Sequence, residues 1–185
     1  MTIIETERLL LREFETADID SLAYIFADAE VMKFSRGIKS REETRAWLAK
    51  CSNNYSSFGF GLWAVVEKSG QEVIGYCGLS CFPDICGQKE VEVGYRLARS
   101  RWGFGFATEA ALAVREYGFN VVGLERLIAL VDPDNTASIR VARKIGMEFE
   151  KEAFLEGYDY PDHVYSIEKQ PGDKERNRVI ASRGE

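Results

Sequence analysis

The sequence has a single histidine, His163, among its 185 residues, and its four cysteines lack the spacing of a zinc site. Neither a metal centre nor a set of disulfides is therefore expected, and the thiols should be reduced. No apolar run approaches the roughly 18 residues that a membrane span needs, and the first residues lack the apolar core of a secretory signal. These absences predict a cytoplasmic protein that holds no metal and does not enter a membrane.

Basic residues are also in short supply. Lys and Arg number 24 against 30 Asp and Glu, and this formal charge of −6 argues against a general nucleic-acid binder. The acidic balance weakly favours a cationic partner such as an amine, although solubility explains it equally well. The length suits one domain, which we place at residues 1–170. A charged tail follows at 171–185, and its lack of hydrophobic periodicity is typical of disordered segments.

Hydrophobic periodicity divides the rest of the chain into short strands and helices. Apolar runs predict strands at 8–12, 62–67, 72–80, 90–97, 126–131, 147–154 and 164–168. N-cap signals and helical spacing predict helices that begin near residues 16 and 40, and two more at 107–119 and 136–145. Residues 82–88 contain Pro83 and Gly87 and are expected to form a loop. This order of elements predicts a mixed α/β (α+β) sheet flanked by helices.

The strongest chemical signal is the stretch Arg-Trp-Gly-Phe-Gly-Phe-Ala-Thr-Glu-Ala at 101–110, between a strand and a helix. Gly103 and Gly105 allow a sharp turn and the close approach of a ligand, and free N–H groups at the start of the helix suit a pyrophosphate. On local physics alone, a turn that merely needs glycine is an equally good explanation. A dinucleotide fingerprint would need glycine at Thr108, and the Gly-Lys-Ser/Thr of a nucleotide-triphosphate loop does not occur.

The same stretch resembles the CoA-binding motif Q/R-x-x-G-x-G/A of the GNAT acetyltransferases, with Gly105 and Ala107 at its two small positions. It is similar to the Rim-type branch, whose members acetylate N-terminal amines of ribosomal proteins, or small amines and antibiotics. Two further stretches resemble this branch in the same order, Glu-Val-Gly-Tyr at 92–95 and Asp-Asn-Thr-Ala-Ser at 134–138. The resemblance covers about residues 6–169.

The resemblance implies the GNAT acyl-CoA N-acyltransferase fold, a mixed, mostly antiparallel sheet of about six to seven strands with about four helices and splayed central strands. It also implies acetyl-CoA as the cosubstrate, with pantetheine bonded to the main chain around 93–95. Arg101 and Arg143 are expected to neutralise CoA phosphates because each is close to a binding loop. The residues expected to bind CoA are Val93, Gly94, Tyr95, Arg101, Trp102, Gly103, Phe104, Gly105, Phe106, Ala107, Thr108, Asn135, Ser138 and Arg143.

Glu92 is the candidate general base. Its neighbours Val91 and Val93 point to the opposite face of the strand, so Glu92 shares a face with Gly94. Strand alternation alone leaves a solvated surface glutamate equally open, and the resemblance favours the base. Glu109 is a weaker candidate: it falls in the first turn of a helix, where a carboxylate complements the helix dipole, so a structural role is favoured.

Ser138 is the second candidate catalytic residue, since the resemblance places it near the CoA sulfur. A serine bonded back to the preceding helical turn is the structural alternative. Asn135 could contact pantetheine or act as a simple N-cap. Where many members of the family have a tyrosine acid, this chain has Ala142. Ser138, Tyr158, Tyr160 or water could therefore supply the proton to the leaving thiolate.

The predicted function is transfer of an acetyl group from acetyl-CoA to a primary amine, on a protein N-terminus or a small molecule, by direct attack with general-base assistance. A non-catalytic CoA-binding sensor or assembly module is the alternative, and the absent tyrosine is its only support. A nicotinamide-dependent oxidoreductase would instead require NAD(P) binding. The sequence does not identify the acceptor, whose pocket is expected to involve residues 30–60 and the final hairpin, nor does it distinguish a monomer from a homodimer.

Overall fold

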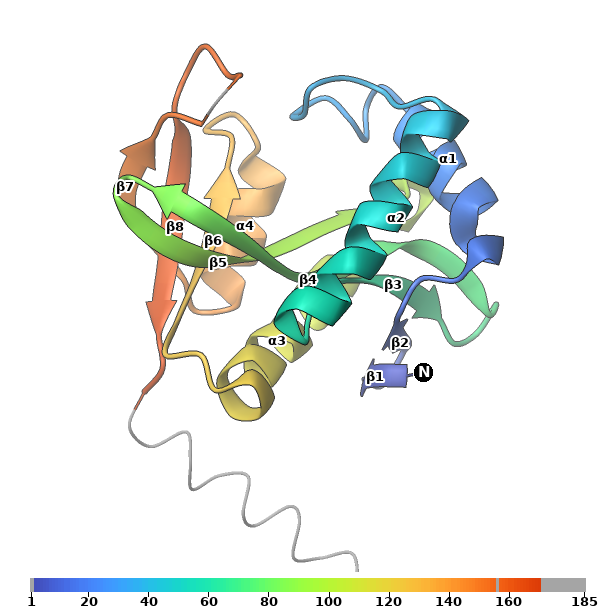
Figure 1. Cartoon of the computed structure of the whole chain (residues 1–185), viewed down its shortest axis with the longest axis horizontal. Helices are drawn as coiled ribbons and strands as arrows, with labels where there is room; N and C mark the ends of the chain where they lie inside the picture. The colour runs from blue at the N-terminus through green and yellow to red at the C-terminus, as the bar shows by residue number, and fades with distance from the viewer. Residues whose placement is uncertain (1, 156, 171–185) are drawn as a thin grey trace, which may run out of the picture.

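The computed structural model describes residues 2–155 and 157–170, which form a three-layer arrangement of helices around one sheet (Figure 1). The predicted tail at 171–185 lies outside the described residues. The strand order is β1-β2-β3-β4-β5-β6-β8-β7, and every neighbouring pair is antiparallel except β5 and β6. The strands are β1 (Thr2–Glu5), β2 (Leu9–Arg12), β3 (Leu62–Glu67), β4 (Glu72–Ile85), β5 (Gln88–Leu97), β6 (Arg126–Val131), β7 (Glu148–Ala153) and β8 (Asp162–Glu168).

Four α-helices in the described residues confirm the predicted helices. They are α1 (Ile19–Ala27), α2 (Arg41–Phe58), α3 (Phe106–Tyr117) and α4 (Thr136–Lys144). The capping box predicted at the start of α2 is present, because Ser40 accepts a bond from the Glu43 N–H while the Glu43 side chain accepts one from the Ser40 N–H. Gly146 follows α4 with a positive φ of 87°, as the helix-ending glycine requires.

Two predictions about the sheet were wrong. The expected loop at 82–88 is mostly strand, because β4 continues to Ile85, β5 begins at Gln88, and only a tight turn separates them. Pro83 is tolerated because it falls in a register irregularity, where no ladder bond needs its missing N–H. The short edge strand β1, which the sequence analysis left out, raises the strand number from the expected six to seven to eight.

The two faces of the sheet are covered differently. On one face, a large apolar cluster joins the strands to α3 and α4 through residues such as Val93, Ala110 and Ile145. On the other face, α1 and α2 form a separate cluster over the first half of the sheet, and a third cluster around Ile128 and Val164 covers the second half. The second face therefore has an interruption in its apolar cover near the middle of the sheet, which leaves room there for polar groups.

The N-terminal ends of the parallel strands are held together by an ion cluster around Arg126. Glu90 of β5 is only 3% exposed, and its carboxylate lies 3.1 Å from the Arg126 guanidinium at the start of β6. Arg126 also pairs with Glu150 of β7 at 2.6 Å and with Glu168 of β8 at 3.0 Å. One guanidinium thus joins four strands.

Across the described helices, none is long and apolar enough to cross a membrane.

Removing this guanidinium should be costly for folding. Arg126→Ala leaves the buried Glu90 carboxylate without its partner, and we expect a loss of about 3 kcal/mol in the free energy of unfolding. Arg41→Ala is the matched control, since Arg41 pairs with Asp20 at 2.7 Å between two exposed side chains. Its loss should stay below about 1 kcal/mol. Urea denaturation of both variants measures the difference, and equal losses would contradict the structural importance of the cluster.

Candidate active site

The centre of the site is the place where β5 and β6 separate. Their parallel ladder contains one pair, Glu92 with Ile128. Beyond it, β5 stays paired with β4 as far as Leu97, and β6 stays paired with β8 as far as Val131. The strands therefore splay, as expected, and residues 93–97 of β5 are not paired with β6. Such an unpaired strand edge offers main-chain donors and acceptors to an extended, amide-containing ligand.

Glu92 stands at the point of separation, on the face of the sheet where the apolar cover is interrupted. The predicted alternation is confirmed, because Val91 and Val93 are buried against the opposite face. Burial raises the pKa of Glu92 to about 7, an effect that the N–H of Leu130, 3.4 Å from Oε1, partly opposes and that the charge of Asp162 reinforces. A half-buried carboxylate with this pKa can both accept and release a proton near neutral pH.

Other polar groups lie on the same face as Glu92. Arg96 of β5 donates to the Ser35 hydroxyl at 3.3 Å, which ties the strand to the connection between α1 and α2. Asp162, at the start of β8, is 9% exposed, and burial together with the nearby Asp132 raises its pKa. The Tyr160 hydroxyl donates to Asp132 at 2.8 Å. Two connections lie at the same edge of the molecule, the one between α1 and α2 and the one between β7 and β8 (Figure 1).

The glycine-rich loop leads into α3 through two residues with left-handed backbone. Gly103 and Gly105 both have φ of 83°, which only glycine adopts without strain. Gly105 is the N-cap of α3, and no side chain caps this helix within the described chain. The loop is anchored behind by Trp102, whose indole N–H donates to the Leu97 carbonyl at 2.9 Å, while Phe104 is 62% exposed. Main-chain N–H groups and the positive end of the helix dipole thus face outward together, an arrangement that suits an anion.

The structure also shows which charges beside this loop are already paired. Glu109 accepts bonds from the Thr6 hydroxyl at 2.6 Å and from the Arg8 main chain at 3.0 Å. Although burial raises its pKa, these bonds lower it overall, so the predicted structural role of Glu109 is confirmed. Arg8 was not predicted to contribute: it lies in the bend between β1 and β2 and donates to the Phe104 carbonyl at 3.0 Å, a contact between distant parts of the chain that no local pattern signals. Arg101 pairs with Glu67 and Glu72, and its predicted role toward phosphate stays a prediction.

Two further predicted residues, Asn135 and Ser138, lie at the start of α4, beside the gap between β5 and β6. Asn135 is the N-cap of α4, and its Oδ1 accepts from the Ser138 N–H at 3.1 Å, which confirms the capping alternative. Ser138 in turn accepts a hydrogen bond from the Tyr95 hydroxyl at 3.0 Å. Only the main chain of Tyr95 was predicted to contribute to the site, although strand alternation places its side chain on the face of α3 and α4. Arg143 lies exposed in the last turn of α4, and its phosphate contact stays a prediction.

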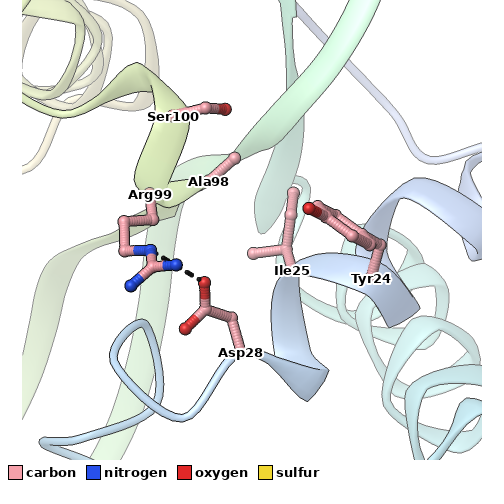
Figure 2. A pocket seen from close by; sticks show the side chains of 6 residues that line it. All are labelled: Tyr24, Ile25, Asp28, Ala98, Arg99 and Ser100. Carbon is pink, nitrogen blue, oxygen red and sulfur yellow. Dashed lines mark ion pairs between the residues drawn. The ribbon is translucent and has the colours of Figure 1, made fainter.

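A shallow hollow opens between the end of α1 and the turn that precedes the glycine-rich loop (Figure 2). An ion pair between Asp28 and Arg99, 3.2 Å apart, spans it, and Tyr24 stands at its rim. None of its lining residues belongs to the predicted site. Among residues 2–155 and 157–170, no group of three or more His, Cys, Asp or Glu side chains is arranged to hold a metal ion.

Comparison with known proteins adds an independent observation. Residues 8–148 match the family model described as the acetyltransferase (GNAT) domain. The chain is 40% identical over 151 residues to the uncharacterized protein YkkB of Bacillus subtilis (strain 168), which covers 81% of this chain and 87% of that protein.

Two solved structures are similar in fold. A GNAT-family acetyltransferase from Bacillus anthracis superposes with a TM-score of 0.76 at 30% identity, over 89% of this chain and 97% of that one. The ribosomal L7/L12 alpha-N-protein acetyltransferase RimL, solved in complex with coenzyme A, superposes with a TM-score of 0.72 at 17% identity, over 91% and 98% of the two chains. At that identity the likeness to RimL concerns the fold alone.

The burial of Glu92 predicts a pH-dependent stability difference. The pKa of Glu92 is about 7 in the folded chain and lower in the unfolded chain. At a pH between the two pKa values, Glu92 is more protonated in the folded chain than in the unfolded chain. The free energy of unfolding therefore falls as pH rises through this interval. Glu92→Gln keeps an oxygen for the Leu130 N–H and removes the titration. The difference in Tm, variant minus unsubstituted chain, should therefore become more positive from pH 5 to pH 8.

The exposed Glu125 offers a matched control, since Glu125→Gln removes a carboxylate that water surrounds and should change the Tm little. Thermal unfolding followed by circular dichroism at several pH values makes the measurement. A Tm difference for Glu92→Gln that is constant with pH would show that this carboxyl is not perturbed by its burial.

Proposed function

The chain belongs to the GNAT acetyltransferase family, which uses acetyl-CoA as its donor, and from this premise we propose that it transfers acetyl to a primary amine by direct attack, with Glu92 as the general base. The observation that carries the proposal is the position of Glu92 where β5 and β6 separate, with its pKa near neutrality. A carboxylate there can take the proton that the attacking nitrogen releases. The carbonyl carbon then exchanges its bond to sulfur for a bond to nitrogen.

The features that support CoA binding lie on the face of the sheet covered by α3 and α4 and along the open edge of β5, whereas the acceptor would approach from the face of Glu92. The uncapped start of α3 would hold the pyrophosphate through its N–H groups, with Gly103 and Gly105 allowing the close approach. The unpaired edge at 93–97 would pair with the pantetheine amides. Asn135 and Ser138, at the start of α4, lie near the same opening.

The acceptor side is consistent with a cationic amine. Glu92 and Asp162 share this face, and Asp132 is close enough to Asp162 to raise its pKa, so the local field favours a positively charged group. A ribosomal-protein N-terminus, as in the Rim-type branch, and a small-molecule amine both have this charge in solution, and each must release one proton to water before its nitrogen can attack. We propose the amine class and no single compound.

The base assignment predicts a pH profile. With one amine acceptor held constant, the ratio of kcat/KM for the unsubstituted chain to that of Glu92→Gln should rise with pH and level off above about 7, because Glu92 must be ionised to accept the proton and the ratio cancels the titration of the amine itself. Glu92→Gln should lower kcat about a hundredfold, while the Kd for CoA is unchanged. Thiol release from acetyl-CoA, assayed over a panel of peptides, polyamines and aminoglycosides, provides the rates.

Glu109→Gln is the comparison variant, since Glu109 is the other carboxylate near the loop and is bound by Thr6 and Arg8. An equal loss of kcat in both variants would contradict the assignment of Glu92. Tight CoA binding without transfer to any amine would instead favour a non-catalytic sensor. NAD(P) binding without CoA binding would favour an oxidoreductase.

The loop assignment predicts a selective loss of CoA affinity. Gly103→Ala forces a side chain into the left-handed region, at a cost of about 1–2 kcal/mol, and places a methyl group beside the outward-facing donors. We expect the Kd for CoA, measured by calorimetry, to rise at least about tenfold. Gly123→Ala is matched, because Gly123 has φ of 80° and equally open surroundings but lies after α3. It should lower the Tm similarly and leave the Kd unchanged, and equal changes in Kd would contradict the loop as the binding site.

A further inference from the structure

One pair of hydroxyl groups forms a hydrogen bond across the gap between β5 and β6. Tyr95 belongs to β5, and Ser138 belongs to the helix that follows β6; their oxygens lie 3.0 Å apart, with the phenol as donor. The Tyr95 ring packs against the core beneath α3 and α4, so its hydroxyl is held in place by the sheet. Ser138 is fixed equally well, because its N–H is capped by Asn135. Neither partner is on a loop, and the geometry of the pair is therefore set by regular structure on both sides.

The two other tyrosines that could serve the leaving group make contacts elsewhere. The Tyr160 hydroxyl donates to Asp132, and the Tyr158 ring lies under the Arg36 guanidinium, with 5.5 Å between the guanidinium carbon and the ring centroid. Ala142, where the family resemblance suggested a tyrosine, is buried and has no polar group. Ser138 lies one helical turn before Ala142 and is the hydroxyl of α4 that faces the splay.

We propose that Tyr95 is a positioning residue for the acetyl transfer: by donating a hydrogen bond to the Ser138 oxygen, it orients the Ser138 O–H toward the leaving sulfur of CoA. This inference rests on the proposed function. Once the serine oxygen accepts from the phenol, its O–H remains free to donate, and hydrogen bonds in such a chain strengthen one another. The first turn of α4 adds the positive end of a helix dipole on the same side.

The role is hydrogen-bond donation, without proton transfer from the phenol. As the amine nitrogen forms its bond to the carbonyl carbon, the C–S bond breaks and its electron pair stays on sulfur. The amine proton goes to Glu92, and the thiolate takes its proton from water. Burial raises the pKa of Tyr95 to about 12, above the value of roughly 8.5 for an ordinary thiol, so the phenol stays protonated while it orients Ser138.

CoA itself is the first probe, and it needs no acceptor. A donor aimed at sulfur stabilises the thiolate and so lowers the thiol pKa of bound CoA. We expect this pKa, measured from the pH dependence of CoA alkylation by iodoacetamide under saturating protein, to be about one unit higher in Tyr95→Phe and in Ser138→Ala than in the unsubstituted chain. Mass spectrometry of the alkylated CoA keeps the four cysteines of the chain out of the measurement. An unchanged thiol pKa in Tyr95→Phe would overturn the proposal.

Steady-state kinetics with an amine acceptor provide the second readout. Tyr95→Phe should lower kcat about tenfold with little change in the KM for acetyl-CoA, and should have no further effect in a Ser138→Ala background, because it acts through that serine. Tyr117→Phe is the matched control, since Tyr117 packs against the same core but lies on α3 against Trp63, and its kcat should be unchanged. Additive losses from Tyr95→Phe and Ser138→Ala, or a rise in KM alone, would overturn the proposal. A thiol pKa that shifts as expected, without transfer to any amine, would support the action of Tyr95 and Ser138 on the CoA sulfur and contradict the proposed function.

Discussion

The separation of β5 from β6 is the constraint on which the rest of the molecule depends. Two parallel strands that share a single ladder pair must be held together by something other than main-chain bonds, and the Arg126 cluster does this at their N-terminal ends. Toward the C-terminal ends each strand follows its antiparallel partner instead, β4 for β5 and β8 for β6. The sheet is thus two antiparallel halves joined at one end. The opening between them brings the glycine-rich loop, the start of α4 and Glu92 to one place.

The same separation accounts for the electrostatics of the site. Glu92 is far enough into the sheet to be desolvated, and the hydrogen bond that it accepts from Leu130 is long, at 3.4 Å. Its charge is therefore poorly compensated, and its pKa rises toward neutrality. Glu90, two residues earlier on the same face, is more buried but meets a guanidinium directly. The two glutamates therefore differ in their partners: Glu90 is held by an ion pair with Arg126, and Glu92 accepts a long hydrogen bond from a main-chain N–H.

Local signals in the sequence were sufficient for most of the elements and for the neighbourhood of the site. The capping box at Ser40, the apolar run of β6 and the alternation around Glu92 each depend on residues close together in the chain, so they could be read without the fold. The β4–β5 turn was misjudged because Pro83 looks like a strand breaker until the register irregularity beside it is known. Arg8 beside the loop and the side chain of Tyr95 beside Ser138 could not be found, because their partners are 96 and 43 residues away.

The absence of a side-chain cap on α3 has a consequence for the folded state itself. A Ser, Thr, Asn or Asp at the N-cap would stabilise this helix by roughly a few tenths of a kcal/mol over glycine, which this chain forgoes because Gly105 has no side chain to offer. Any anion that occupies these donors supplies the missing partner, and its binding energy adds to the free energy of unfolding in proportion to the logarithm of its concentration. Under the proposed function this anion is the pyrophosphate of CoA, so the free energy of unfolding of the chain would depend on the concentration of its own cosubstrate.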